Sequence, residues 1–240
     1  MSSLIVFLDI GGVINDKRQQ TAEFQRQVGD YFAPLLGGTA EAWNEAHRVI
    51  ATRLLEQEEA LAQAAPDFIS FHRTYNHKWL GAMCELLGFP ILPQEECIAL
   101  ADHAIASIAS HVRAALPGAI EAIRLLHRQG YRLHTASGTF SFELEGYMKG
   151  IGVQRCFGRL YGADLINTFK NGPEYYEHIF ADLGIGPTEA LVVDDSFDAI
   201  GWAAQTGART ALVNTSSHPV PGMTPRIGSL AELPAFLSGT

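Results

Sequence analysis

Acidic side chains follow short apolar runs directly at two places in the sequence. Asp9 comes after residues 4–8, and the pair Asp194-Asp195 comes after residues 190–193. An aspartate that ends a strand is often only a helix cap, so neither place alone indicates a site. A carboxylate can nevertheless attack an electrophile such as phosphorus, and several carboxylates together can hold a hard divalent cation. The order of the surrounding elements therefore decides whether these acids meet.

Two further polar residues lie where an ordered α/β chain would place them beside the acids. Thr135 ends a strand-like run at residues 131–135, and Lys170 precedes a helical segment. In open parallel sheets, ligands bind beyond the carboxyl ends of the strands. We therefore expect Asp9, Thr135, Lys170 and the acidic pair to lie at one edge of a sheet.

Alternation of strands and helices predicts that sheet. Residues 4–8 form a continuously apolar run, which is typical of a strand buried on both faces. After Gly118, further strands are expected at residues 131–135, 190–193 and 210–213, with helices at 119–129, 142–149, 174–183 and 199–206. This pattern predicts a Rossmann-like, doubly wound parallel sheet of the α/β class.

A different pattern fills the stretch between the first and second strands. From about residue 21 to 110, helical periodicity dominates, as in residues 40–59 and 95–110. We therefore predict an α/β core formed by residues 1–14 and 113–240, with an all-helical cap domain at residues 15–112.

Four segments of the sequence resemble, in order, the four motifs of the haloacid dehalogenase superfamily. They are Phe7-Leu8-Asp9-Ile10-Gly11-Gly12, Leu133-His134-Thr135-Ala136-Ser137, Lys170-Asn171-Gly172-Pro173-Glu174-Tyr175-Tyr176 and Val193-Asp194-Asp195-Ser196. The helical insert also lies where superfamily members with a helical cap carry it. The resemblance implies a magnesium-dependent hydrolase that cleaves a small phosphorylated metabolite.

The resemblance also implies a role for each motif residue. Asp9 would be the nucleophile that forms an aspartyl-phosphate, with Thr135 and Lys170 as its catalytic partners on the phosphate. Mg²⁺ would be held by Asp9, the Gly11 carbonyl, Asp195 and Asp194. Substrate contacts would come from Gly11, Gly12, Thr135, Ala136, Ser137 and Lys170, and we add Arg73 of the cap as a candidate.

One position departs from the family pattern. Phosphatases of the superfamily usually carry a second aspartate two residues after the nucleophile, where this chain has Gly11. That aspartate is a general acid and base, a role worth about 10²–10⁴-fold in rate. Asp16, Asp194 or a cap residue could replace it, or the leaving group could need little protonation. Alternatively, the chain is a weakly active relative that binds a phosphorylated ligand or a partner protein.

Two other reactions occur in the superfamily without the second aspartate. Haloacid dehalogenases break a carbon–halogen bond without Mg²⁺, which would leave Asp194-Asp195 unexplained. Phosphonoacetaldehyde hydrolases break a carbon–phosphorus bond with a cap lysine, for which Lys78 is the candidate.

Bulk composition excludes several other classes of function. With 47% hydrophobic and 18% charged residues, the 240-residue chain suits a soluble enzyme. A net charge of −9 and the lack of basic runs argue against nucleic-acid binding. Three widely spaced cysteines and the lack of a membrane-length apolar stretch predict a cytoplasmic protein. Nothing in the sequence indicates the oligomeric state.

Overall fold

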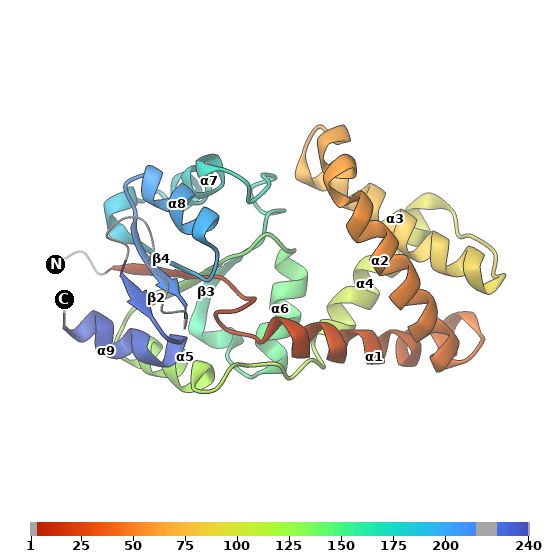
Figure 1. Ribbon diagram of the computed structural model, residues 1–240, viewed down its shortest axis with the longest axis horizontal. Coiled ribbons are helices and arrows are strands. Elements are labelled where there is room, and N and C mark those ends of the chain that lie inside the picture. Colours follow the sequence, from red (N-terminus) through yellow and green to blue (C-terminus); the bar gives the residue numbers. More distant parts are fainter. Residues whose placement is uncertain (1–3, 215–224, 240) are drawn as a thin grey trace.

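A parallel sheet forms the centre of the larger lobe of the molecule (Figure 1). The computed structural model describes residues 4–214 and 225–239. Within these residues the sheet has six strands in the order β3-β2-β1-β4-β5-β6, all parallel. They are β1 (Ile5–Leu8), β2 (Arg132–Ala136), β3 (Phe157–Tyr161), β4 (Ala190–Asp194), β5 (Arg209–Val213) and β6 (Arg226–Ile227). The predicted doubly wound α/β class is confirmed, with β1 between β2 and β4.

Helices cover both faces of this sheet because its strands are apolar on both sides. One face packs against α5 (Ala119–Arg128), α6 (Ser141–Gly150) and α9 (Leu233–Ser238), and the other against α7 (Pro173–Leu183) and α8 (Phe197–Gln205). In β1, Val6 and Leu8 point to the first face, whereas Ile5 and Phe7 point to the second. This alternation explains why the strand is apolar at every position.

Four helices between β1 and α5 form a separate lobe, which we call the helical insert (Figure 1). They are α1 (Lys17–Leu36), α2 (Ala40–Ala64), α3 (Phe68–Leu87) and α4 (Gln94–Ala109). Asp16, Thr39 and Asp67 cap the first three by accepting a hydrogen bond from a first-turn N–H. The insert has an apolar core of its own around Phe32 and Trp43. The division of the chain at residues 14 and 112 into two domains stays a prediction, and residues 1–3, 215–224 and 240 lie outside the described residues.

Two strands were not predicted, and both lie toward an edge of the sheet. β3 is the edge strand beside β2, and its residues 158 and 159 are exposed. β6 has only two residues. Neither strand has the long apolar run that identifies a central strand, so the sequence pattern that predicted β1, β2, β4 and β5 is lacking there.

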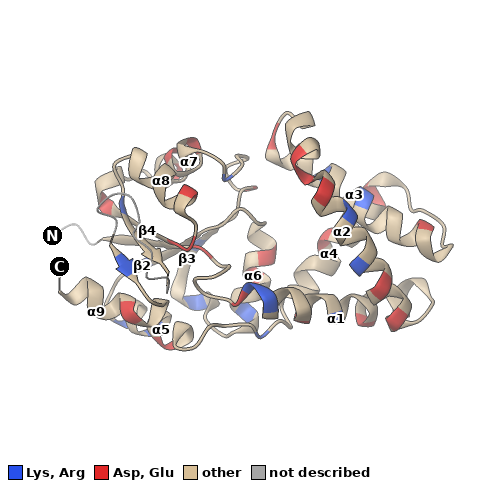
Figure 2. Ribbon diagram, in the orientation of Figure 1, with Lys and Arg blue, Asp and Glu red and all other residues tan. Residues whose placement is uncertain are grey.

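Acidic and basic residues are interspersed over both lobes (Figure 2). The view shows no face on which Lys and Arg predominate, in keeping with the net charge of −9. Across residues 4–214 and 225–239, none of the helices combines the length and apolar character needed to cross a bilayer. The absence of nucleic-acid partners and the cytoplasmic location remain predictions.

His134 of β2 is buried in the core as a neutral ring, which makes stability depend on pH. Its ring stacks on Phe7 at 5.5 Å between centroids, and its Nδ1 accepts a hydrogen bond from the Arg159 N–H at 3.0 Å. Burial lowers the pKa of His134 to about 4. This value lies below the ordinary pKa of about 6.5. The contribution of the neutral His134 ring to the free energy of unfolding is therefore complete above pH 6.5 and is lost as the pH falls toward 4.

We expect His134→Asn to lack this pH dependence, because the amide oxygen can accept the same hydrogen bond but does not titrate. Urea unfolding at pH 7 and pH 4 would measure the free energy of unfolding of both proteins. The advantage of the wild type over the variant should shrink by about 3 kcal/mol between these pH values. An identical pH dependence in both proteins would contradict a neutral, buried His134.

Candidate functional site

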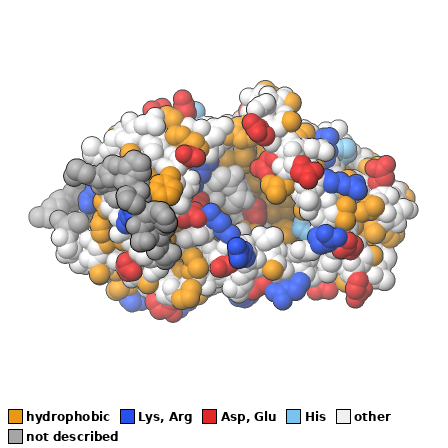
Figure 3. Space-filling view, viewed as in Figure 1, with side chains coloured by type: hydrophobic (Ala, Val, Ile, Leu, Met, Phe, Trp, Pro, Cys, Tyr) orange, Lys and Arg blue, Asp and Glu red, His pale blue; other side chains and the backbone are white. Residues whose placement is uncertain are grey.

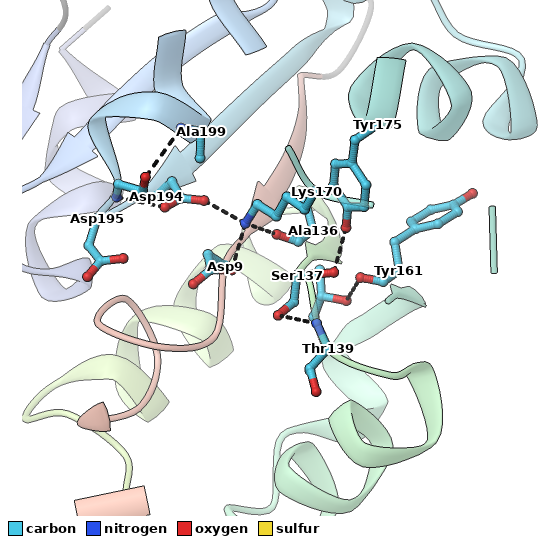
Figure 4. Close-up of polar contacts among 12 residues, drawn as sticks. Asp9, Ala136, Ser137, Thr139, Tyr161, Lys170, Tyr175, Asp194, Asp195 and Ala199 are labelled. Atoms are coloured by element: carbon cyan, nitrogen blue, oxygen red, sulfur yellow. Dashed lines mark hydrogen bonds and ion pairs between the residues drawn. The ribbon is translucent and has the colours of Figure 1, made fainter. Parts of the chain in front are cut away.

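Asp9 lies directly beyond the end of β1, between the ends of β2 and β4 (Figure 4). Leu8 of β1 pairs with Thr135 of β2 and, on its other side, with the last apolar residue of β4. The next residues of the three strands, Asp9, Ala136 and Asp194, therefore meet at one edge of the sheet. This is the carboxyl edge at which parallel sheets bind ligands.

Lys170 joins these strand ends through three hydrogen bonds (Figure 4). Its Nζ lies 2.7 Å from Oδ1 of Asp9, 2.7 Å from Oδ2 of Asp194 and 2.7 Å from the carbonyl oxygen of Ala136. Burial would lower the pKa of Lys170, but the Asp9 and Asp194 carboxylates outweigh it and raise that pKa well above its ordinary value. The ammonium is therefore fixed and charged.

Asp194 is the most deeply buried acid of the site, with a side chain that is 2% exposed. Burial raises the pKa of Asp194 to about 6, with a further rise from the Asp9 charge and an opposing effect of Lys170. Its other oxygen, Oδ1, accepts a hydrogen bond from the Ser196 N–H at 2.8 Å. Asp194 is thus held on both sides, which fixes the direction of its carboxylate.

Asp9, Asp194 and Asp195 form a cluster of carboxylates that fits a hard divalent cation. One oxygen atom from each lies within 4.8 Å of the others, close to the roughly 4.2 Å between opposite ligands of an octahedral Mg²⁺. Gly12 lies against this cluster at a φ of 81°, and a Cβ there would lie 2.2 Å from Oδ2 of Asp195. Only glycine leaves room for the Asp195 carboxylate.

Lys17, at the start of α1, was not predicted as part of the site. Its Nζ lies 2.7 Å from Oδ2 of Asp195, and its Cε would lie 2.9 Å from a Cβ on Gly11. The lysine stem therefore fills the room beside Gly11. In the sequence Lys17 and Arg18 are only a pair of basic residues at the start of a helix, so nothing there could have identified the contact of Lys17 with Asp195.

The side chain of Thr135 is placed differently from the prediction. Thr135 is fully buried, and its hydroxyl donates to the carbonyl oxygen of Tyr161 at 3.2 Å. β2 continues to Ala136, so Ser137 is the first residue beyond the strand. The carbonyl of Ser137 accepts from the Tyr175 hydroxyl at 2.7 Å, and its Oγ accepts from the Thr139 N–H at 3.4 Å (Figure 4). The Thr135 hydroxyl is therefore engaged within the sheet, and Ser137 is the first residue beyond the strand end; a phosphate contact of either residue stays a prediction.

Two other predicted contacts are already engaged within the protein. Arg73 pairs with Glu95 of α4 on the surface of the insert, and it does not line the cavity between the insert and the core. The structure therefore gives no support to the predicted contact of Arg73 with the substrate, which stays a prediction. The N–H of Gly12 donates to the Asn15 carbonyl at 2.7 Å, so this N–H already has a partner within the protein and is not free for the substrate contact predicted for Gly12.

That cavity has a volume of about 460 Å³, and Lys170 lines it. Gly138 and Thr139 line it from the loop after β2, and His72 and Asn76 line it from α3. Figure 3 shows this region as a hollow between the two lobes, with hydrophobic side chains inside it. Lys78 lines a different hollow, within the insert beside Gly81 and Glu85. A Schiff-base role for Lys78 is therefore not supported.

Comparisons with known proteins agree with this geometry. The family model described as haloacid dehalogenase-like hydrolase matches residues 4–207. A 2-haloacid dehalogenase from Pseudomonas syringae is 18% identical with a TM-score of 0.67, and the match covers 99% of each chain. A HAD phosphatase from Thermococcus onnurineus is 21% identical with a TM-score of 0.60, covering 98% of each chain.

An L-2-haloacid dehalogenase from Xanthobacter autotrophicus is 17% identical with a TM-score of 0.59, and the match covers 99% of each chain. No curated protein sequence matches this chain significantly. At these identities the solved structures establish the shared fold, whereas the family match spans most of the sequence. The chain belongs to the haloacid dehalogenase-like hydrolases.

Proposed function

We propose that this hydrolase cleaves a small phosphate monoester, with Mg²⁺, through an aspartyl-phosphate on Asp9. The observation that carries the proposal is the convergence of three carboxylates within 4.8 Å beside the fixed ammonium of Lys170. A dehalogenase needs only one attacking carboxylate, whereas transfer of a charged phosphoryl group needs cations around it. The acidic cluster is the feature that supplies a place for such a cation.

The chain's own groups divide the reaction into two displacements. An Oδ atom of Asp9 forms a bond to phosphorus while the bond from phosphorus to the alcohol oxygen breaks, and this oxygen takes a proton from solvent water as the alcohol leaves. Water then attacks the phosphoryl group, which releases inorganic phosphate and restores the Asp9 carboxylate. Lys170 and the Ser137 hydroxyl lie at the strand ends, where they can bind phosphoryl oxygens and hold them in line.

Asp9, Asp194 and Asp195 would hold the metal, with the Gly11 carbonyl as a further oxygen ligand. When bound, Mg²⁺ supplies positive charge that reduces repulsion between the attacking carboxylate and the phosphoryl oxygens. Lys17 would then move from Asp195, which its exposed side chain permits, because 60% of that side chain is accessible to solvent.

The test is phosphate release from a panel of phosphate monoesters with Mg²⁺ and, in parallel, with EDTA. We expect turnover that requires Mg²⁺ and is lost with EDTA. Absence of Mg²⁺-dependent release from every compound would overturn the proposal.

A second candidate is hydrolytic dehalogenation, which the contact of Lys17 with Asp195 favours. In that contact the Lys17 ammonium is paired with Asp195, a carboxylate that a metal would need as a ligand. Gly11 also has no side chain that could donate a proton to the leaving group. Halide release from 2-chloropropionate in the presence of EDTA would support this candidate. Phosphate release that depends on Mg²⁺, without halide release, would reject it.

Restoring the second aspartate should raise turnover of simple alkyl phosphates. In Gly11→Asp the three atoms nearest to the new Cβ all belong to Lys17, with Cε at 2.9 Å and Cγ at 3.2 Å, so the exposed lysine side chain would have to move aside. We expect kcat to rise by about 10- to 100-fold, because alkoxide leaving groups need a proton. Gly11→Asn, of the same size but without the acid, is the control and should bring no gain. An equal effect of both variants would indicate a change of shape instead of proton donation.

Thr135 and Ser137 can be separated by one pair of variants. We expect Thr135→Val to keep kcat/KM within about twofold and to lower the free energy of unfolding by about 1 kcal/mol, because only the buried hydrogen bond to Tyr161 is lost. Ser137→Ala should lower kcat/KM by on the order of 10²-fold, since a donor to the phosphoryl group disappears. Steady-state kinetics and urea unfolding of both variants measure these effects. A larger loss of kcat/KM in Thr135→Val than in Ser137→Ala would instead indicate that Thr135 binds the phosphoryl group.

A further inference from the structure

The cavity between the two lobes adjoins the site at Asp9 through Lys170. Lys170 both donates to Asp9 and lines the cavity, so a phosphoryl group bound at Lys170 would direct the rest of its molecule into this space. At about 460 Å³ the cavity has the size of a pocket for a small ligand. Its walls therefore indicate what kind of group is attached to the phosphate.

Aromatic rings from both lobes form much of these walls. Phe68 and Phe71 come from α3, whereas Phe140 and Phe169 come from loops of the core. Ring centroids lie 4.9 Å apart for Phe68 and Phe140, 5.2 Å for Phe68 and Phe169, and 5.5 Å for Phe71 and Phe169. These are ordinary distances for packed aromatic pairs, so the apolar walls are held in place before a ligand arrives.

The charges around the cavity do not suit a second anionic group on the ligand. Among the described residues that line it, Lys170 is the one lysine or arginine, and Asp9 and Asp194 already engage its ammonium. His72 is paired with Asp102 at 2.9 Å. The other ionisable lining groups include two acids, Glu58 and Glu143. A carboxylate placed here would lose water without gaining a free cation, which is unfavourable.

We propose that the cavity holds an uncharged aromatic or branched aliphatic group, the alcohol part of the phosphate monoester. This assignment rests on the proposed phosphatase activity and narrows it to one substrate class. It disfavours phosphorylated hydroxy acids and also 2-haloacids, because both carry a carboxylate.

Binding of uncleavable analogues tests the cavity without relying on turnover. We would compare 3-phenylpropylphosphonate with 3-phosphonopropionate by isothermal titration calorimetry on the wild-type chain with Mg²⁺. The two compounds share the phosphonate and differ in the group that would enter the cavity. We expect the phenyl compound to bind at least 30-fold more tightly. Equal affinities, or tighter binding of the carboxylate, would overturn the assignment.

Turnover separates this assignment from the proposed function. We expect kcat/KM for 2-phenylethyl phosphate and 3-methylbutyl phosphate to exceed that for phosphoglycolate by at least 100-fold. Mg²⁺-dependent turnover with the opposite preference would overturn the substrate class alone. Absence of turnover from these three compounds and from the whole panel of monoesters would overturn the phosphatase activity, while the phosphonate affinities would still decide which group the cavity accepts.

A cation added to the wall should change the preference. Tyr75 lines the cavity, and Tyr75→Arg should tighten binding of 3-phosphonopropionate at least tenfold relative to methylphosphonate. Thr74→Arg is the matched control, because Thr74 is the neighbouring residue of α3 but is exposed and does not line the cavity. The same gain in both variants would indicate a long-range effect of charge and would count against recognition by the cavity wall.

Discussion

Asp9→Asn is expected to reduce kcat/KM for every substrate by at least about 10⁴-fold, because an amide cannot replace the carboxylate that attacks phosphorus. The fold should persist, since the amide oxygen can still accept a hydrogen bond from Lys170, whose Nζ lies 2.7 Å from Oδ1 of Asp9 in the wild type. Steady-state kinetics with Mg²⁺ would measure the loss, and circular dichroism would verify the fold. In the wild type, rapid quenching and mass spectrometry should find the phosphoryl group on the peptide that contains Asp9.

Asp16→Asn is the matched control for this substitution. Asp16 lies in the same loop, but its Oδ1 accepts a hydrogen bond from the Gln19 N–H at 2.8 Å and caps α1. Asparagine caps helices about as well as aspartate, so we expect near wild-type kinetics. A large loss in Asp16→Asn would instead make Asp16 the missing general acid. Residual Mg²⁺-dependent turnover in Asp9→Asn would require a different nucleophile.

The central strands could be predicted from sequence because burial on both faces leaves a simple pattern. β1 is apolar at all four positions, and β4 is buried along its whole length. β3 lies at an edge, and only its last residue, Tyr161, is buried, so the same criterion fails there. A strand can therefore be predicted from its sequence to the extent that helices bury both of its faces. An edge strand is less buried, so fewer of its positions have to be apolar.

The candidate site could be predicted only where a strand end fixes the residue. Asp9 and Asp194 meet because neighbouring parallel strands bring their carboxyl ends together. The sequence predicts Thr135 as a catalytic partner and Ser137 only as a substrate contact, because it does not define where β2 ends; the structure extends that strand to Ala136. Lys17 and Asp195 lie 178 positions apart in the sequence, so no local pattern encodes their contact.

Lys170→Met is expected to destabilise the protein more than any of the other substitutions. The side chains of Lys170, Asp9 and Asp194 are 10%, 13% and 2% exposed, so the variant leaves two buried carboxylates without their cation. Removing one partner of such a pair lowers the free energy of unfolding by about 3–5 kcal/mol. Activity should fall by about 10³-fold as well, because the phosphoryl oxygens lose a fixed positive charge. Urea unfolding and steady-state kinetics at pH 7.5 would measure both effects.

Three measurements separate the loss of charge from a general disruption of packing. Mg²⁺ should stabilise Lys170→Met more than the wild type, because it can neutralise the same carboxylates when it binds the folded state. Adding Asp194→Asn should recover part of the loss by removing one of them. The loss should also shrink as the pH falls toward 6. The pKa of Asp194 is about 6 in the wild type and rises further without Lys170, so above pH 6 the variant takes up the proton that removes its uncompensated charge while the wild type is still ionised. Lys149→Met, at an exposed position of α6, should change stability by no more than about 0.5 kcal/mol. If Lys170→Met proved as harmless as this control, the ammonium could not be the group that holds the acidic cluster together.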